Sequence, residues 1–255
     1  MAEPSARFLD GGQYSVESIG KYERIYGRDF ISPGGADTAR GFISMLDLKA
    51  GDRVLDAGCG IGGAAFLMAE EHGASVEGID LSKNMIERAT KRCRDLNLDT
   101  MVTFRQGDLM DLTAERRFDA IYSRDVFLHV ENKLALFDVL MRALKPDGRV
   151  LITDYCRGEG RLSEAFERYV SERGYFLTTI GEYERLLRDA GFARVHAEDL
   201  TAQFAEIHAR ELERLERSGD AAGELSDLAA SWRVKRERAL KGEQRWGLFT
   251  AMGFE

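Results

Sequence analysis

The sequence predicts an α/β protein built around one mostly parallel β-sheet. From about residue 53 onward, short apolar runs of strand length alternate with stretches of helical periodicity, the pattern typical of βα units. A glycine-rich turn joins the first apolar run to the first helical stretch. The length of 255 residues suits a single α/β domain with one large core better than it suits two domains.

Seven apolar or alternating runs predict the strands of this sheet. They cover residues 53–57, 75–79, 101–105, 118–122, 149–154, 192–199 and 245–252. The segment LKPDG at 144–148 predicts a type I turn before the fifth strand, with proline at the second turn position and glycine at the fourth. The closing run QRWGLFTAMGF alternates aromatic and apolar residues, and we expect it to lie antiparallel beside 192–199.

Helical periodicity fills the gaps between these strands. The expected helices cover residues 62–72, 83–97, 131–144, 161–173 and 179–190. Residues 203–241 contain no strand pattern and many charged residues, so they predict a helical insert before the last strand. Residues 1–50 predict a helical N-terminal cap rather than a domain of their own.

Composition and charge argue against several classes of protein. No apolar run reaches the roughly 18 residues that a membrane span needs, so no membrane partner is expected. The start, MAEPSARFLD, lacks a basic segment followed by an apolar one, which predicts a cytoplasmic location. A net charge of −8 argues against a nucleic-acid partner, because phosphate backbones are bound by surfaces rich in Lys and Arg. Cys59, Cys93 and Cys156 lack the spacing of metal ligands and predict reduced thiols without a metal site.

The segment VLDAGCGIGG at 54–63 combines a strand, a glycine-rich turn and the start of a helix. Gly58, Gly60 and Gly63 match G-x-G-x-x-G, a pattern that brings backbone N–H groups close to a ligand. Asp80 follows the second strand about 20 residues later, where a carboxylate accepts ribose hydroxyls. These features alone fit a dinucleotide-binding dehydrogenase as well as a protein that binds S-adenosylmethionine.

Three further observations favour S-adenosylmethionine. Asp56 lies two residues before Gly58, where a carboxylate is awkward beside a pyrophosphate but suits the ammonium group of a methionine moiety. Asp108 follows the third strand, where it can accept from an adenine amino group. The predicted closing strands are absent from a fold made of two nucleotide-binding halves.

The segment YSRDVFLHV at 122–130 places polar residues where the fourth strand should end. Arg124, Asp125 and His129 follow an apolar run, and the carboxyl ends of parallel strands are where ligands bind in open α/β sheets. Asp125 is a candidate cofactor contact, and His129 falls on the same side if the segment turns helical. Arg124 is left unassigned, without a chemical role beyond pairing with a neighbouring acid.

Residues 50–155 resemble the class I S-adenosylmethionine-dependent methyltransferases. This resemblance implies a Rossmann-like α/β fold with seven strands, the last of them antiparallel, and the cofactor across the carboxyl ends of strands one and four. It divides a single domain into a lid-forming cap (1–50), a cofactor-binding core (51–156) and substrate-binding helices with closing strands (157–255).

The flanking segments are similar to those of the phosphoethanolamine N-methyltransferase family, in particular its single-domain type in malaria parasites. The similarity extends from about residue 8 to 249 and rests on four separated stretches. These are GGQYSVESIGKYERIYGRDFISPGG at 11–35, YSRDVFLH at 122–129, ITDYC at 152–156 and QRWG at 244–247.

The resemblance implies roles for residues of this chain. Tyr14 and His129 would form the catalytic pair at the substrate amine. The implied cofactor contacts are Ile31, Ser32, Asp56, Gly58, Gly60, Asp80, Leu81, Asp108, Leu109 and Asp125. The implied contacts to the phosphorylated substrate are Tyr22, Tyr155, Tyr169, Arg173, Tyr175 and Lys235.

The residues themselves support part of this assignment. Tyr169 and Arg173 are four apart and share one helix face, where a phenol and a guanidinium can converge on an anion. Lys235 adds a donor from the helical insert. His129 is the side chain best matched to accept a proton near neutral pH.

The predicted activity is therefore methylation of phosphoethanolamine, or of its mono- and dimethyl forms, toward phosphocholine by a monomer that uses S-adenosylmethionine. Other small-molecule methyltransferases remain alternatives, either of the glycine or sarcosine type or acting on carbon or sulfur. A non-catalytic S-adenosylmethionine-binding protein and a nicotinamide enzyme are further alternatives.

Overall fold

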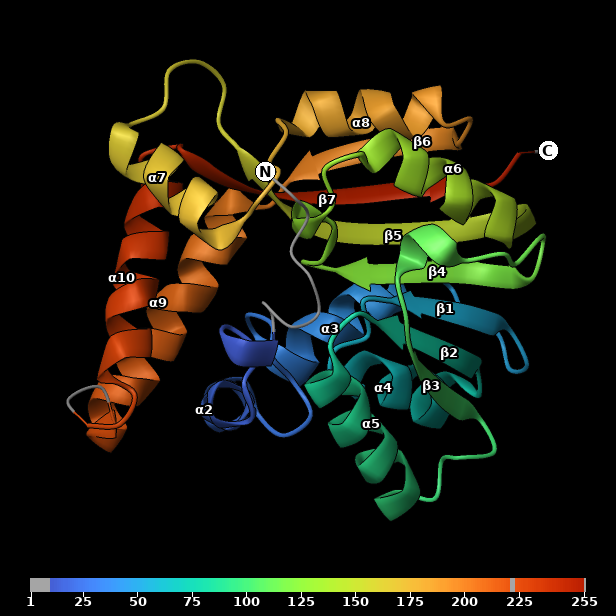
Figure 1. Ribbon diagram of the computed structural model, residues 1–255, viewed down its shortest axis with the longest axis horizontal. Coiled ribbons are helices and arrows are strands. Elements are labelled where there is room, and N and C mark those ends of the chain that lie inside the picture. The colour runs from blue at the N-terminus through green and yellow to red at the C-terminus, as the bar shows by residue number, and fades with distance from the viewer. Residues whose placement is uncertain (1–9, 221–222, 255) are drawn as a thin grey trace.

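The computed structural model describes residues 10–220 and 223–254 of the chain, and these form one seven-stranded sheet flanked by helices (Figure 1). The first nine residues of the predicted cap, with the start of the family resemblance near residue 8, lie outside the described residues. The strands are β1 (Arg53–Ala57), β2 (Ser75–Asp80), β3 (Val102–Gln106), β4 (Phe118–Arg124), β5 (Leu144–Arg157), β6 (Ala193–Asp199) and β7 (Gln244–Met252). Their order is β3-β2-β1-β4-β5-β7-β6.

The pairing directions confirm the predicted fold class. β1 is parallel to β2 and β4, β2 to β3, and β4 to β5, whereas β7 is antiparallel to both β5 and β6. The last strand thus lies antiparallel beside 193–199, as the alternating sequence predicted. It also inserts between β5 and β6.

The predicted helices are present with small shifts at their ends. They are α2 (Val16–Tyr26), α3 (Gly35–Ser44), α4 (Gly63–His72), α5 (Lys83–Asp95), α6 (Lys133–Ala143), α7 (Glu164–Arg173), α8 (Ile180–Asp189), α9 (Thr201–Ser218) and α10 (Ser226–Leu240). Two short 3₁₀ helices, η1 (Leu109–Asp111) and η2 (Phe127–His129), follow β3 and β4. Side-chain oxygens of Ser82, Ser163 and Thr179 accept from backbone N–H groups at the starts of α5, α7 and α8, which fixes where these helices begin.

The predicted type I turn at 144–148 is wrong. Asp147 has φ of 59°, whereas both central residues of a type I turn have negative φ. The segment bulges out of a longer strand, since Leu144 pairs with Phe118 and Arg149 pairs with Ala120. β5 therefore begins at Leu144 and not at 149.

Both faces of the sheet are buried. Val54 and Tyr122 belong to an apolar cluster with residues of α3, α4, α9 and α10, whereas their neighbours Leu55 and Ile121 belong to a cluster with α6 and α8. Burial on both faces explains why the central strands are continuous apolar runs.

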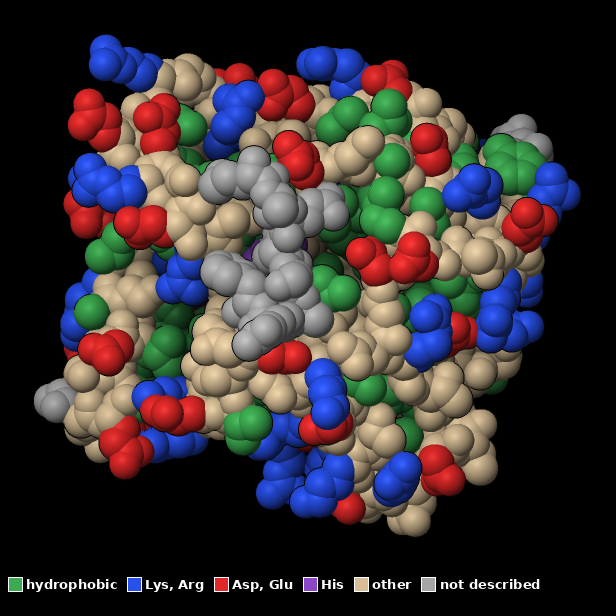
Figure 2. Space-filling model, in the orientation of Figure 1, with side chains coloured by type: hydrophobic (Ala, Val, Ile, Leu, Met, Phe, Trp, Pro, Cys, Tyr) green, Lys and Arg blue, Asp and Glu red, His purple; other side chains and the backbone are tan. Residues whose placement is uncertain are grey.

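The carboxyl ends of β1, β4 and β5 point toward α2 and the α9–α10 pair in Figure 1. The helical cap and the helical insert therefore meet at the edge of the sheet where ligands bind in such folds. Lys and Arg side chains are interspersed with Asp and Glu over the face shown in Figure 2, without one basic stripe. None of the helices in the described ranges combines the length and apolar composition of a membrane span.

Candidate functional site

A cavity of about 490 Å³ opens at this edge of the sheet. Its walls come from the cap, the glycine-rich turn, the segments after β2, β3 and β4, and the insert. Every predicted site residue lines it except Tyr169 and Arg173, which contact the lining residues Tyr175 and Gln13, respectively. The predicted residues that line the cavity are spread through the sequence from Tyr14 to Lys235, and the fold brings them around one space.

The glycine-rich turn forms one wall of the cavity. Gly58 has φ of 79°, and a Cβ atom at this position would lie 2.3 Å from the side chain of Val126. Glycine is therefore required both by the left-handed backbone and by the close approach of the segment after β4. The N–H groups of Gly58 and Cys59 donate to the Ile79 carbonyl at 2.8 and 3.1 Å, which holds the turn against β2.

Two carboxylates face the turn, Asp56 buried and Asp80 partly buried. Asp80 accepts from the N–H groups of Gly60 and Ser82 at 2.9 and 2.8 Å, and burial raises its pKa to about 6. Burial, together with the nearby charge of Asp80, raises the pKa of Asp56 to about 7. Asp56 Oδ2 is buried and has no hydrogen-bond partner among the described residues. A cationic donor in the cavity would satisfy this oxygen.

Replacing Asp56 by asparagine is expected to stabilise the ligand-free protein at alkaline pH. The folded-state pKa of about 7 exceeds the unfolded value near 3.8, so ionising Asp56 costs folding free energy as pH rises from about 4 to 8. We expect Asp56→Asn to raise the free energy of unfolding by about 1–4 kcal/mol at pH 8 and to have little effect at pH 4. Urea unfolding at both pH values, with exposed Asp99→Asn as control, measures this. Equal effects of Asp56→Asn at both values would contradict it.

Asp125 lines the cavity just after the end of β4. It follows β4 with φ of 58°, a left-handed conformation that aspartate tolerates better than most residues. The indole N–H of Trp246 and the hydroxyl of Thr153 donate to its Oδ1 at 2.7 and 3.1 Å. Its Oδ2 remains buried and without a partner in the described part of the chain. Trp246 belongs to the QRWG stretch, which gives that stretch a structural role.

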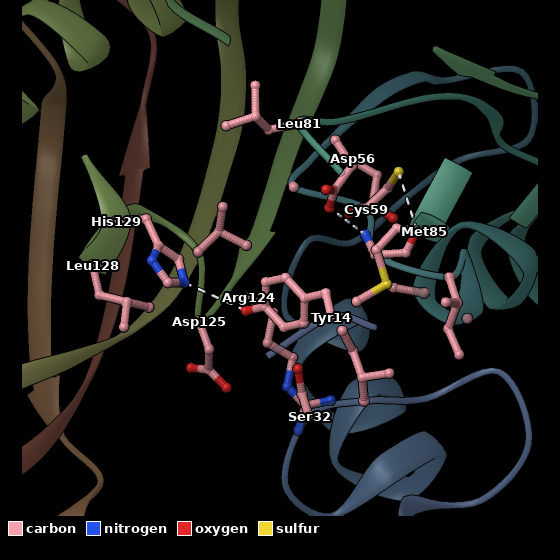
Figure 3. Close-up of a pocket in the computed structure, with 18 of the residues that line it drawn as sticks. Tyr14, Ser32, Asp56, Cys59, Leu81, Met85, Arg124, Asp125, Leu128 and His129 are labelled. Atoms are coloured by element: carbon pink, nitrogen blue, oxygen red, sulfur yellow. Dashed lines mark hydrogen bonds between the residues drawn. The ribbon is translucent and has the colours of Figure 1, made fainter. Parts of the chain in front are cut away.

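His129 and Tyr14 meet across the cavity. The Tyr14 hydroxyl lies 3.4 Å from His129 Nε2, and Figure 3 shows Tyr14 reaching toward the imidazole from the cap. Burial, followed by the charges of Lys133 and Arg173, lowers the pKa of His129 to about 4. Burial also raises the pKa of Tyr14. The pair is therefore a neutral imidazole facing a neutral phenol.

Gln13 connects this pair to the predicted phosphate-binding residues. Its amide nitrogen donates to the Tyr14 hydroxyl at 3.2 Å. Its amide oxygen accepts from Arg173 at 3.1 Å and from the Tyr175 hydroxyl at 3.4 Å. Two donors from the α7 region thus converge on one oxygen at the wall of the cavity. The sequence prediction missed Gln13, although it stands beside Tyr14 in the stretch GGQYS.

The other predicted substrate contacts surround Tyr175. The Tyr169 ring packs edge-on against Tyr175, with ring centroids 5.8 Å apart, and its buried hydroxyl has no partner among the described residues. Tyr155 lines the cavity, and Lys235 Nζ lies 5.4 Å from the centroid of its ring. Tyr22 lines the cavity from α2.

Arg124 pairs with no acid among the residues that the structure describes. In the described part of the chain its guanidinium donates to the backbone carbonyls of Pro33 and Gly35. It thereby fastens the loop that carries Ile31 and Ser32, two predicted cofactor contacts, to the end of β4. The sequence left Arg124 without a role because backbone acceptors from a distant loop leave no signal in the local sequence.

Comparison with known proteins assigns the family. Residues 48–211 match the family model described as a methyltransferase domain. The chain is 44% identical over 251 residues to phosphoethanolamine N-methyltransferase 1 of Zea mays, covering 96% of this chain and 50% of that protein. It is 34% identical to the phosphoethanolamine N-methyltransferase of Plasmodium falciparum, covering 96% of this chain and 94% of that protein. The chain thus spans about half the length of the plant relatives and nearly the whole length of the parasite relative.

A solved structure shares the whole fold. It is Haemonchus contortus phosphoethanolamine N-methyltransferase 2, in complex with phosphomonomethylethanolamine and S-adenosylhomocysteine. The two structures superpose with a TM-score of 0.94 at 37% identity, over 98% of this chain and 61% of that one. By its sequence over almost its full length and by its fold, the chain belongs to the phosphoethanolamine N-methyltransferase family of methyltransferases.

Proposed function

We propose that this protein methylates the amine of phosphoethanolamine, or of its mono- and dimethyl forms, toward phosphocholine with S-adenosylmethionine as methyl donor. The observation that carries the proposal is the meeting, in one cavity, of a Tyr14–His129 pair with a cluster of cationic and phenolic donors. In this proposal residues 1–50 form the lid, 51–156 bind the cofactor, and 157–255 complete the substrate pocket of a single domain.

The cofactor half of the cavity fits S-adenosylmethionine. Its unpartnered oxygens, Asp56 Oδ2 and Asp125 Oδ2, call for donors or a cation, which the ammonium group of a methionine moiety offers. Asp80 suits ribose hydroxyls, and Asp108 lies after β3 where it would face an adenine amino group. Ile31, Ser32, Gly58, Gly60, Leu81 and Leu109 complete the predicted contacts. When bound, S-adenosylmethionine supplies an electrophilic methyl group on its sulfonium centre.

The amine requires a proton acceptor and a dry environment. A primary amine with a pKa near 10.4 is protonated at pH 7, about 3.4 pH units below its pKa. Removing its proton to free the lone pair therefore costs roughly 4–5 kcal/mol. His129 is neutral in the ligand-free site and able to accept a proton, and the negative charge of a bound phosphate would increase its proton affinity. Tyr14 closes the cavity over the amine from the cap, which excludes water and fixes the amine for in-line transfer.

A phosphate group requires hydrogen-bond donors and cations around it, without carboxylates that would repel it. Arg173 and the Tyr175 hydroxyl already direct hydrogen bonds to the same point, the amide oxygen of Gln13. Tyr155, Tyr169 and Lys235 stand nearby, so the cluster suits a phosphomonoester dianion.

A panel of acceptors tests this proposal. The protein is incubated with S-adenosylmethionine and, separately, with phosphoethanolamine, its mono- and dimethyl forms, ethanolamine and sarcosine, and S-adenosylhomocysteine formation is measured. We expect turnover with at least one phosphorylated amine, and at most slight turnover with ethanolamine and sarcosine. Faster turnover with sarcosine than with every phosphorylated amine would overturn the substrate assignment.

A further inference from the structure

The first turn of α5 holds the segment that carries Tyr14. The side-chain amide of Asn84 donates to the carbonyl of Tyr14 at 3.0 Å and to the carbonyl of Asp10 at 3.3 Å. One side chain thus ties both ends of the turn from residue 10 to 14. This turn also contains Gln13, so Asn84 sets the position of Gln13 and Tyr14, two of the cap residues that line the cavity.

Two other residues of the same helical turn strengthen this attachment. The Ser82 hydroxyl and the Lys83 backbone N–H both donate to the carboxylate of Asp10, the latter at 3.2 Å. Met85, which is 1% exposed, forms a small apolar cluster with Ile19 and Ile61, and the Tyr14 ring packs against this cluster. Polar anchors therefore fix the backbone of the cap while an apolar contact fixes the Tyr14 ring.

The support under the cap is continuous with the cofactor half of the site. Asp80, which ends β2, accepts from the N–H of Ser82. Leu81, the residue between these two in the sequence, lines the cavity. Figure 3 shows Met85 on the side of the cavity from which Tyr14 extends toward His129. A ligand that immobilises Asp80 and Leu81 therefore also immobilises the start of α5, where Asn84 binds the cap.

We propose that Asn84 is a positioning residue that latches the Gln13–Tyr14 segment over the substrate amine, and that cofactor binding at Asp80 reinforces this latch. The inference rests on the proposed function for its effect on catalysis. The latch itself is a property of the cap and α5 and is measured without a methyl acceptor.

Asn84→Asp is the variant of choice. It keeps the shape of the side chain but loses the N–H donors, and an acid in the first turn of a helix is favourable, so α5 should still form. Asn84→Ala serves as a second variant without added charge. Lys83→Ala is the matched control, because it changes an exposed side chain of the same turn and keeps the backbone N–H that Asp10 accepts from.

Amide hydrogen exchange measures directly how firmly Asn84 holds residues 10–14. In the wild type and in Lys83→Ala, we expect S-adenosylhomocysteine to slow amide exchange in peptides covering residues 10–20. In both Asn84 variants we expect amides of residues 10–20 to exchange faster than in the wild type. The factor by which S-adenosylhomocysteine slows this exchange should be at least threefold smaller, and exchange in β1 and β4 should be unchanged. Wild-type exchange of residues 10–20 in both variants would overturn the latch.

Kinetics then separate positioning from general damage. We expect methyl transfer to slow by about 10- to 100-fold in Asn84→Asp, which is the effect of losing two neutral hydrogen bonds, while cofactor affinity stays within about threefold. In a Tyr14→Ala background, which removes both the hydroxyl and the ring, the same change should add less than about threefold, because the latch acts through Tyr14. A full additional loss in that background would overturn the positioning role. Altered exchange without turnover on any phosphorylated amine would instead refute the proposed function and leave the latch standing.

Discussion

Replacing His129 by asparagine is expected to slow methyl transfer by about 10²- to 10⁴-fold, the usual contribution of a positioned proton acceptor. The affinity for S-adenosylmethionine should stay within about threefold, because His129 faces Tyr14 and Tyr175 and not the glycine-rich turn. Single-turnover rates, measured beside cofactor titration calorimetry, separate the two quantities.

The geometry of the pair explains why His129 should dominate. Its Nε2 lies 3.4 Å from the Tyr14 hydroxyl, and its ring packs edge-on against Tyr175 at 5.2 Å between centroids. The imidazole therefore stands where the amine must enter if Tyr175 belongs to the phosphate pocket. Tyr14→Phe removes one hydroxyl but keeps the ring that covers the amine, so a smaller loss is expected than for His129→Asn.

His196 offers a matched control for this prediction. It is exposed on β6, and His196→Asn should leave the rate unchanged. A rate for His129→Asn within about threefold of the wild type would refute its role as proton acceptor, whatever the effect of Tyr14→Phe.

Local patterns were sufficient to predict the sheet and the acids at its edge. Apolar runs have a period set by strand geometry, and parallel strands present all their carboxyl ends at one edge. Asp56, Asp80, Asp108 and Asp125 therefore had to lie near one another once the strands were identified, and all four line the cavity.

Contacts between distant segments could not be predicted in the same way. Gln13 bonds to residues about 160 positions away, and Arg124 bonds to the carbonyls of a loop about 90 positions away. Neither partner is determined by local periodicity or by residue type, because an amide and a guanidinium each have many possible acceptors. The bulge at 145–148 was missed for a related reason: pairing with β4 continues on both sides of it, which local turn chemistry does not reveal.

Replacing Arg173 by alanine is expected to raise the KM for phosphoethanolamine by about 30-fold or more. Removing a charged donor from a phosphate that is desolvated on binding costs about 2–5 kcal/mol. The guanidinium of Arg173 is directed at Gln13 in the cavity wall, where the proposed phosphate pocket lies. The affinity for S-adenosylmethionine should change little. Arg168→Ala, on the exposed side of the same helix, is the control and should leave both quantities unchanged.

Ethanolamine distinguishes a direct phosphate contact from an indirect effect through Gln13. Arg173 donates to Gln13, and Gln13 donates to Tyr14, so an indirect effect of losing Arg173 would disturb the proposed catalytic pair without any loss of phosphate binding. An indirect effect would slow transfer to ethanolamine and to phosphoethanolamine by the same factor. Loss of a phosphate contact would raise the KM for phosphoethanolamine only. The ratio of kcat/KM for phosphoethanolamine to that for ethanolamine would then fall by the same 30-fold. The KM of Arg173→Lys for phosphoethanolamine should fall between those of the wild type and Arg173→Ala. Lysine keeps the charge but lacks the bidentate donor geometry that fits a phosphate.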